Sequence, residues 1–565
     1  MSETVVGKRK PVKYSPILPG TEDWPVVQLS RNRKQFIQEI ITESELRVKG
    51  ITINRNALID ELESTLYTEM LRVKKNPWKV DPEDEYAFWH KIKSNLLNLT
   101  NDSQAAAAKT EEKLLKEIIS RYTEEIAGNF KPSHYRLART LVTYGFSRLL
   151  NAARIKKFGA FWRNDYTLQD KIHITGEMEH VRELAKKGTV IMVPTHFSNL
   201  DSILIGWVIH TLGLPPFIYG AGLNLFNISI FAYFMNSLGA YKVDRRKKNV
   251  PYLETLKSYS SMAIRKGCHS LFFPGGTRSR SGSIENKLKL GLLGTAIEAQ
   301  RMNYEQDGDK AKKVFIVPVV LNYHFVLEAP SLIHEHLAQQ GQERYYYEND
   351  EYSTSYKIFK FMIQFFTKGS DISVSIGKPM DVLGNPVDKE GNSLDPHNRI
   401  IDTKDYFTSN QKVTRNKQRE DEYTRMLSHV IVKRYHEINR VFSSHLVAFV
   451  AFEIIKKRHP RLDLFNLLRL PEEEQVISYD EFKAKCQLLA TEILQRKEKG
   501  QIDVASHFYE DLDELIAHGL SNVGMYHSKR PLIRDKKGNI TTQDLATLYY
   551  YHNRLDGYGF EKFIK

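Results

Sequence analysis

Cysteine is scarce and long apolar runs are missing from this chain of 565 residues. Its two cysteines, Cys268 and Cys486, cannot form a disulfide framework, which favours a reducing cytosol. No stretch reaches the roughly 20 apolar residues that a membrane-spanning helix needs. The first residues, MSETVVGKRKPVKY, lack the apolar core of a signal peptide. We therefore expect neither a disulfide-rich secreted domain nor a membrane-spanning protein.

Acidic residues are outnumbered by basic ones, 68 against 82, which gives a net charge of +14. Such a surplus favours polyanionic partners, namely nucleic acid, an anionic membrane surface or phosphorylated substrates, although a merely soluble basic protein would show it too. Zinc-finger spacing and the aromatic signature of common RNA-binding domains are both absent. We expect no nucleic-acid partner, no bound metal ion and no cofactor.

The periodicity of apolar residues divides the chain into four parts. Residues 1–165 are predicted to be a helical N-terminal domain, with a well-formed helix at Ala105–Ile126. Residues 166–385 alternate short apolar strands with helices, which predicts an α/β domain with a mixed, largely parallel sheet covered by helices. Residues 386–420 form an exposed polar insertion or linker, and residues 421–565 a helical C-terminal region. The expected strands are Lys171–Gly176, Thr189–Pro194, Ser270–Phe273, Val314–Leu321 and Ile372–Ile376.

Two apolar segments admit more than one interpretation. Residues 131–162 mix basic and aromatic side chains, which suits a membrane surface or the core of a helical domain equally well. The run LVAFVAF at Leu446–Phe452 is too short to span a bilayer. We expect it to be core, with a shallow membrane contact as the minor alternative.

The motif HFSNLD places His196 and Asp201 five residues apart, directly after a predicted strand. Five residues turn a helix by about 140° and alternate faces in a strand, so the two side chains meet only across a turn. Pro194 ends the strand, and Ser198 or Asn199 can cap the following helix. A carboxylate beside an imidazole orients a general base. Taken alone, however, Ser198 and Asp201 also match a capping box, which needs no chemistry.

A donor-rich loop, FFPGGTRSRSG, follows another apolar strand at Phe272–Gly282. Glycine lets backbone N–H groups approach a phosphate, hydroxyls donate to its oxygens, and arginine offers a permanently charged fork. An ordinary glycine-rich turn with surface arginines is the alternative. The expected anion-binding residues here are Gly276, Thr277, Arg278, Ser279 and Arg280.

Two further blocks are weak alone. GAYKVDRR at Gly239–Arg246 adds cations after an apolar stretch, but a solvated charge cluster would look the same. VPVVLNY at Val317–Tyr323 is a buried strand. Their order and separation relative to HFSNLD and the glycine-rich loop make the set more specific than any member.

These four blocks resemble the glycerolipid acyltransferase superfamily, whose members carry H-x₄-D, G-x₃-hydrophobic-x-R, FPEGTRS-type and VPV-type blocks. Within it, FFPGGTRSRSG followed by KLG at Lys289–Gly291, and YYYHNRL at Tyr549–Leu555, are most similar to the glycerol-3-phosphate acyltransferase branch. VDR at Val243–Arg245 is closer to the 1-acylglycerol-3-phosphate branch. Gly275 stands where the family usually has glutamate, so a nearby acid replaces that residue or its role is dispensable.

The resemblance implies transfer of an acyl group from acyl-CoA or acyl-carrier protein to the hydroxyl of glycerol-3-phosphate. His196 would be the general base and Asp201 its orienting carboxylate, with backbone N–H groups near the helix start as oxyanion donors. Arg245, Arg278, Thr277, Ser279 and Lys289 would hold the phosphate. Leu225–Phe234 would line an acyl path, unless it is ordinary core.

Two alternatives remain open: a 1-acylglycerol-3-phosphate acyltransferase, and a non-catalytic lipid- or acyl-carrier-binding protein on the same fold. Without a spanning helix but with a basic surplus, the protein is expected to bind an anionic membrane peripherally, on its cytoplasmic face.

Overall fold

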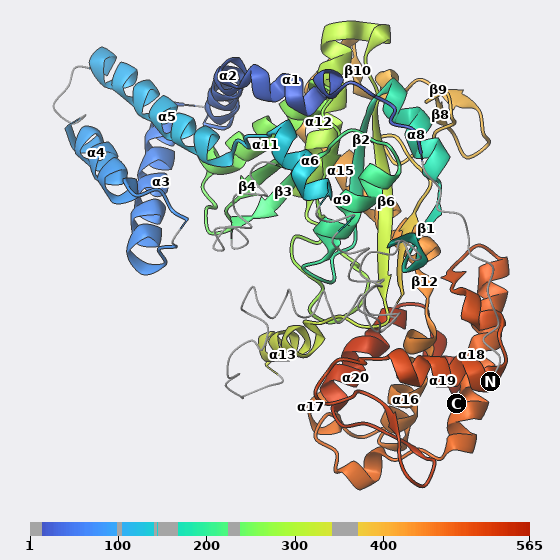
Figure 1. Ribbon diagram of the computed structural model, residues 1–565. Helices are drawn as coiled ribbons and strands as arrows, with labels where there is room; N and C mark the ends of the chain where they lie inside the picture. Colours follow the sequence, from blue (N-terminus) through green and yellow to red (C-terminus); the bar gives the residue numbers. More distant parts are fainter. Residues whose placement is uncertain are drawn as a thin grey trace.

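The computed structural model describes residues 14–52, 54–78, 80–98, 104–140, 144, 168–223, 238–341 and 371–564 (Figure 1). Leu225–Phe234 and the part of the basic-aromatic segment from 145 to 162 lie outside these residues. Within them, no helix has the length and apolar character required to cross a membrane.

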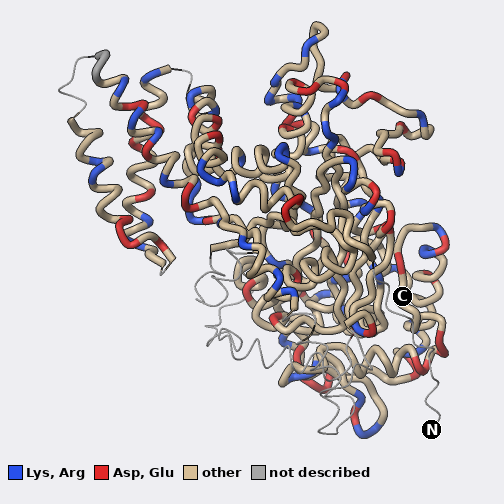
Figure 2. The backbone as a smooth tube through the Cα atoms, turned by 45° about the horizontal axis from the view of Figure 1, so that its top comes forward, with Lys and Arg blue, Asp and Glu red and all other residues tan. Residues whose placement is uncertain are grey.

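The N-terminal region is helical, as predicted. Its helices pack their apolar faces together and against helix α11 (Val250–Arg265) of the next region. Acidic and basic residues are interspersed along them (Figure 2). Ala105–Ile126 was predicted to be one helix, and α5 covers it with one more residue. The helices are α1 (Pro25–Arg31), α2 (Arg33–Ile51), α3 (Arg55–Lys75), α4 (Glu85–Asn98), α5 (Gln104–Ile126) and α6 (Pro132–Thr140).

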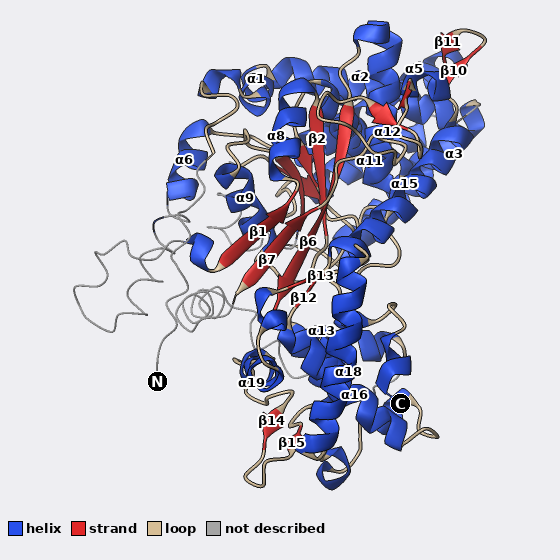
Figure 3. Ribbon diagram, turned by 90° about the vertical axis from the view of Figure 1, so that its right-hand side faces the viewer, coloured by secondary structure: helices blue, strands red, loops and turns tan. Residues whose placement is uncertain are grey.

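A seven-stranded mixed sheet forms the centre of the molecule, with helices on both sides (Figure 3). Its strand order is β1-β7-β6-β2-β5-β3-β4, and β6 with β7 is its one antiparallel pair. The largely parallel sheet predicted from the sequence is therefore confirmed. The strands are β1 (Ile172–Gly176), β2 (Thr189–Pro194), β3 (Ile218–Gly222), β4 (Ala240–Val243), β5 (Ser270–Leu271), β6 (Val314–Tyr323) and β7 (Ile372–Ile376).

The central strands are apolar along their whole length because both faces are covered. Every residue of β2 and of β6 is buried, which explains why neither strand shows alternating polarity. The covering helices of this region are α8 (Met178–Lys187), α9 (Asp201–Thr211), α11 (Val250–Arg265), α12 (Leu290–Asp307) and α13 (Ala329–Gln339).

Most residues of the segment 386–420, which was expected to be an exposed polar insertion or linker, are exposed or partly exposed. Two short hairpins fold this segment onto the α/β region: β8 (Ser393–Leu394) with β9 (Ile400–Ile401), and β10 (Thr408–Ser409) with β11 (Lys412–Val413). Phe407 is fully buried, and the Thr403 and Tyr304 hydroxyls hydrogen bond at 2.5 Å. These few buried residues attach an otherwise polar segment to the α/β region. The polar residues around them gave no sequence pattern that marks such contacts.

Helix α15 (Lys417–Ile438) covers the sheet rather than belonging to the C-terminal helices. Its buried Tyr435 donates a hydrogen bond to the carbonyl of Val193 at the end of β2. The remaining region is mainly helical and surrounds α16 (Ser443–Arg458), where every residue from Ser443 to Ile455 is buried. The prediction that LVAFVAF is core is therefore confirmed. The other elements are β12 (Arg440–Val441), α17 (Leu464–Leu467), α18 (Tyr479–Glu498), β13 (Asp503–Val504), α19 (Leu512–Asn522), β14 (Ile533–Arg534), β15 (Ile540–Thr541) and α20 (Leu545–His552).

Candidate active site

The four sequence blocks meet at one edge of the sheet. HFSNLD follows β2, the glycine-rich loop follows β5, VDRR ends β4, and VPVVLNY is most of β6. All four strands run parallel, so their carboxyl ends emerge on the same side. Residues that follow those ends are brought together, which is the usual position of functional groups in such sheets.

His196 and Asp201 contact each other across the turn that their spacing requires. Nδ1 of His196 lies 2.8 Å from Oδ2 of Asp201, and Asp201 begins helix α9. Because a carboxylate only accepts hydrogen bonds, the proton sits on Nδ1 and the lone pair on Nε2. The His196 side chain keeps 18% exposure while Asp201 is fully buried, so the imidazole can be reached by a substrate. Phe273 stacks on the ring with centroids 4.2 Å apart.

Asp201 is held by more contacts than the dyad requires. Its Oδ2 also accepts the backbone N–H groups of Phe197 at 2.6 Å and Ser198 at 2.9 Å. Its Oδ1 accepts the hydroxyl of Tyr323, the last residue of β6. Burial beside this carboxylate raises the pKa of Tyr323 well above its ordinary value, so the phenol stays a donor. The carboxylate therefore has a single orientation, which it imposes on His196.

The helix cap differs from the expectation that Ser198 or Asn199 would supply it. Leu200 occupies the cap position without a side-chain hydrogen bond to the helix. Instead, Glu328 accepts the Ser198 hydroxyl at 3.1 Å and the Asn199 backbone N–H at 2.9 Å. The Leu200 N–H donates to the Ser198 hydroxyl at 3.3 Å.

Backbone N–H groups near the start of α9 were expected to stabilise an oxyanion. Those of residues 196–201 all have acceptors within the turn or on neighbouring carboxylates. In this arrangement they cannot also donate to a substrate oxygen. The sequence could not reveal this, because Glu285 and Glu328 lie 89 and 130 residues from their partners in the turn.

Gly275 faces a glutamate from elsewhere in the loop. A Cβ at Gly275 would lie 3.0 Å from both Cγ and Oε1 of Glu285. The same Oε1 accepts the backbone N–H of His196 at 2.9 Å. Gly275 has no positive φ, so its backbone conformation does not require glycine. The side chain of Glu285 occupies the space that a side chain at position 275 would take. Burial raises the pKa of Glu285 to about 7, which the His196 N–H partly offsets.

The glycine-rich loop lies directly on the catalytic turn. The Ser279 N–H donates to the carbonyl of His196 at 2.7 Å. Gly276 has φ of +80°, and the stem of Lys289 covers it at 3.0 Å from the position of a Cβ, so only glycine fits. The Ser279 hydroxyl is used inside the loop, where it donates to the carbonyl of Ser283 at 2.7 Å. The backbone N–H groups of Thr277 and Arg278 have no acceptor among the described residues.

Three arginines from two loops, Arg245, Arg278 and Arg280, lie near enough to influence one another's charge. Partial burial, together with repulsion by Arg280 and Arg278, lowers the pKa of Arg245. No carboxylate within the described ranges pairs with Arg245, whereas Arg278 contacts Glu328 at 3.2 Å and Arg280 contacts Glu335 at 2.8 Å. Like charges this close favour an anion between them.

The neighbours of Arg245 have a different use. Arg246 pairs with Asp81 and with Asp244, and its guanidinium lies over the ring of Trp78 at 4.1 Å. Lys247 pairs with Glu125. These contacts anchor the loop after β4 to the N-terminal helices and leave Arg245 exposed, near enough to Arg278 and Arg280 for their charges to lower its pKa. The VDRRKK cluster therefore divides into structural cations and one that faces the site.

The segment YYYHNRL of the C-terminal region, Tyr549–Leu555, packs against the glycine-rich loop and the turn after β2. The Asn553 amide donates to the carbonyl of Ser281 at 2.9 Å, and a Cβ at Gly282 would lie 2.1 Å from the carbonyl oxygen of Tyr550. Arg554 lies over the ring of Phe197 at 3.7 Å and donates to Asn322 Oδ1 at 2.7 Å. Its Nη1 is buried without a partner among the described residues, and burial lowers the pKa of Arg554 to about 10.

Comparison with known proteins agrees with this geometry. Residues 172–322 match the family model described as Acyltransferase. A glycerol-3-phosphate acyltransferase of Shewanella sp. (strain ANA-3) is 26% identical over 265 residues, 46% of this chain and 29% of the relative. One from Pseudoalteromonas translucida is 30% identical over 237 residues, 42% of this chain and 25% of the relative. The chain thus spans less than a third of the length of these two relatives.

Among solved structures, the 1-acyl-sn-glycerophosphate (LPA) acyltransferase from Thermotoga maritima is 12% identical. The superposition covers 66% of this chain and 93% of the Thermotoga maritima chain, with a TM-score of 0.24.

Proposed function

We propose that this chain, whose residues 172–322 form an acyltransferase domain, transfers an acyl group from a thioester to the hydroxyl of glycerol-3-phosphate. The observation that carries the proposal is the contact between an accessible His196, fixed by Asp201, and a loop that presents unpaired N–H groups and arginines. A base beside an anion site suits an acceptor that carries both a hydroxyl and a phosphate.

His196 Nε2 takes the proton of the acceptor hydroxyl as its oxygen attacks the thioester carbonyl. Asp201 stabilises the imidazolium that forms. Collapse of the tetrahedral intermediate breaks the carbon–sulfur bond, and the thiolate leaves with the proton from His196. The products are an ester and a thiol, acyl-CoA or acyl-carrier protein being the donor. No covalent intermediate on Ser198 is needed. The Ser198 hydroxyl already donates a hydrogen bond to Glu328.

Arg245, Arg278 and Arg280 would hold the phosphate, together with the N–H groups of Thr277 and Arg278 at Gly276. Arg278 would exchange part of its contact with Glu328 for the ligand. Lys289, whose stem lies over Gly276, adds a further cation, while Ser279 supports the loop rather than binding substrate.

Glu285 would take the place of the glutamate that the family usually carries at the position of Gly275. Its carboxylate occupies the space beside Gly275 and binds the backbone of the base itself. This gives the substitution at 275 a compensation ten residues later, and it argues against a non-catalytic protein on this fold.

An acylation assay with glycerol-3-phosphate and with lysophosphatidate as separate acceptors tests the proposal. We expect turnover of glycerol-3-phosphate, with His196→Ala reducing kcat by about 10²–10⁴-fold. Turnover of lysophosphatidate alone would instead identify a 1-acylglycerol-3-phosphate acyltransferase. An unchanged rate in His196→Ala would refute the mechanism, and retention of ligand without turnover would indicate a binding protein.

Peripheral attachment to the cytoplasmic face of a membrane is a separate proposal. The net charge of +14 favours anionic lipid, since each basic residue near such a surface contributes about 1 kcal/mol. The protein should therefore pellet with phosphatidylserine-containing vesicles at low salt and be released at high salt. Recovery in the supernatant at low salt would contradict it.

A further inference from the structure

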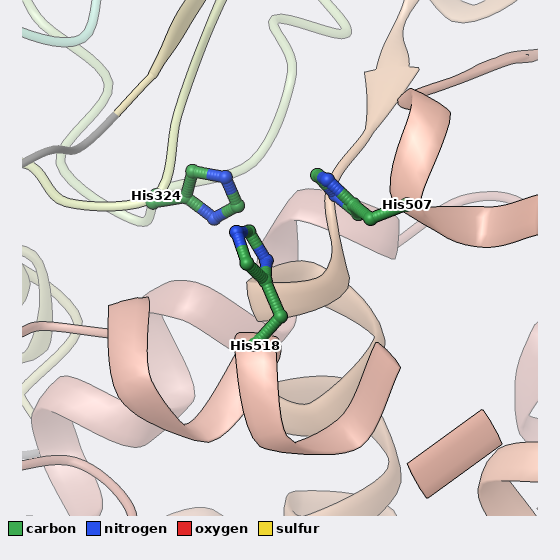
Figure 4. A group of neighbouring side chains, drawn as sticks. All are labelled: His324, His507 and His518. Carbon is green, nitrogen blue, oxygen red and sulfur yellow. The ribbon is translucent and has the colours of Figure 1, made fainter. Parts of the chain in front are cut away.

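Three histidines lie together where the central sheet meets the C-terminal helices, away from the catalytic turn. His324 follows β6, His507 lies in the 3₁₀ turn Ser506–Tyr509, and His518 lies in α19 (Figure 4). One ring nitrogen of each lies within 4.8 Å of one ring nitrogen of the other two. His324 and His507 are buried and His518 is partly buried, so the cluster is largely shielded from water.

The first two residues of α16 orient two of these rings. Nδ1 of His324 lies 2.9 Å from the Ser444 hydroxyl, and Nδ1 of His518 lies 2.8 Å from the Ser443 hydroxyl. When each serine oxygen accepts the Nδ1 proton, the lone pair is on Nε2. A polar group that fixes the tautomer from behind in this way is the usual support of a metal-ligating histidine.

Two of the three rings, those of His324 and His518, keep an Nε2 without a hydrogen-bond partner among the described residues. Nε2 of His324 is buried with no hydrogen-bond partner among the described residues. Such an orphan is costly, since an unsatisfied buried polar atom loses about 1–3 kcal/mol. Nε2 of His518 likewise has no hydrogen bond within the described part of the chain. His507 differs, because its Nε2 accepts the Ser443 backbone N–H at 3.1 Å.

From this cluster we infer a binding site for a divalent transition-metal ion of the Zn²⁺ class, with His324, His507 and His518 as ligands. Three neutral imidazoles and one water make a common tetrahedral set for zinc. With Zn–N bonds of about 2.0–2.1 Å, ligand nitrogens lie about 3.4 Å apart. The widest pair here would close by about 1.4 Å, which modest side-chain rotations supply. His507 exchanges its Ser443 bond for the metal bond.

The charge around the cluster suits such an ion. Burial is the main factor that keeps the pKa of His507 at about 3, and it also lowers that of His518, so the rings are neutral without metal. Asp371 lies close enough to raise the pKa of both. A nearby carboxylate partly balances a divalent charge, although Lys171 and Arg440 oppose it weakly.

A metal here would connect the C-terminal helices to the sheet beside Tyr323, which adjoins His324 and holds Asp201. The sequence offers no clear sign of it, because His324 lies 183 residues before His507, although His507 and His518 are only 11 residues apart. The absence of a metal signal in the sequence is thus a matter of spacing. The inference stands whether or not the proposed acyl transfer is correct.

Metal retention by the full chain tests the site. After incubation with excess ZnCl₂ and gel filtration, we expect about one zinc per chain by elemental analysis, and a higher Tm than after EDTA treatment. His324→Gln and His518→Gln should each lose the retained zinc and the EDTA-sensitive part of the Tm. His397→Gln removes an exposed histidine of the β8–β9 hairpin and should retain both.

Co²⁺ substitution gives a direct readout in the wild-type protein, which does not depend on how well any variant folds. Wild-type protein should develop the intense visible absorption of tetrahedral cobalt, and His518→Gln should not. A wild-type chain that retains no more zinc than His324→Gln, shows no cobalt band and has an EDTA-independent Tm would overturn the inference. The histidines would then be a purely hydrogen-bonded junction.

Discussion

The turn from His196 to Asp201 and the glycine-rich loop Phe272–Gly282, called the anion loop below, are neighbours. They differ in how many of their polar groups have hydrogen-bond partners. In the turn from His196 to Asp201 each backbone N–H has an acceptor, and Asp201 accepts four hydrogen bonds. Beside it, Thr277 and Arg278 present unused N–H groups, and Arg245 has no carboxylate partner among the residues described. One half of the site satisfies its own polar groups, and the other presents donors without acceptors among the described residues.

In the proposed mechanism this difference gives the two halves separate tasks. His196, as the proposed base, is already oriented and needs no reorganisation when a substrate arrives. The glycine-rich loop presents unpaired donors, for which a substrate phosphate would supply acceptors. Substitutions in the turn should therefore change kcat, whereas substitutions among the arginines should change KM.

The largest effect is expected from Asp201→Asn. An amide cannot accept the backbone N–H groups of Phe197 and Ser198, the ring Nδ1–H of His196 and the Tyr323 hydroxyl together, so His196 takes the wrong tautomer. We expect kcat to fall about 10³-fold or more, as in other carboxylate–histidine pairs, with KM for glycerol-3-phosphate little changed. Tyr323→Phe removes one of these contacts and should lose much less. Equal losses in the two variants would contradict the role of the carboxylate in setting the tautomer.

Glu285→Gln should change how stability depends on pH. The pKa of Glu285 is about 7 in the folded protein against 4.5 for an unperturbed carboxyl. Because the folded state holds the proton more tightly, its stability falls as pH rises from about 4.5 to about 7 and is level above that. Relative to Glu285→Gln, the wild type should lose about 3 kcal/mol of unfolding free energy over this window. Denaturant titrations at about pH 5 and pH 8 measure it, and parallel curves would show that Glu285 titrates normally.

Restoring the family glutamate should work only when Glu285 makes room for it. In Gly275→Glu the new Cβ meets Glu285 at 3.0 Å and two carboxylates compete for one site. We expect this variant to lose about 1–3 kcal/mol of stability, with activity reduced. The double variant Gly275→Glu/Glu285→Ala should recover more than half of both. Additive losses would mean that the two positions do not share a function.

The smallest effect concerns Arg245. Its replacement by alanine removes one of three cations and should raise KM for glycerol-3-phosphate about tenfold, since a hydrogen bond to a charged group contributes about 1.5–3 kcal/mol. Neither kcat nor KM for the acyl donor should change much. Lys248→Ala, which removes an exposed cation from the same loop, is the matched control and should alter KM less than twofold. A similar rise in the KM for glycerol-3-phosphate in Arg245→Ala and Lys248→Ala would show that overall charge, not Arg245 itself, is responsible.

Local patterns carried most of the fold and the centre of the site. Thr189–Pro194 and Ile372–Ile376 are strands with the predicted bounds, because continuous apolar runs of this length are typical of buried strands. The spacing of His196 and Asp201 required a turn between them, and the resemblance to the acyltransferases predicted their contact. The partners of these residues, Glu285, Glu328 and Tyr323, were missed as such, because tertiary contacts leave no periodic trace in one sequence. Arg554 was visible only as part of a block similar to the family.

The hydrogen bond from Asn553 to Ser281 spans 272 residues of sequence. During synthesis on the ribosome, the strand, turn and arginines of the site are all made long before the helix that packs against Gly282. The anion loop therefore lacks its support until residues near 554 have left the exit tunnel. A nascent chain stalled earlier would carry His196 and Asp201 without this support of the loop, so the proposed anion site would be completed late in translation.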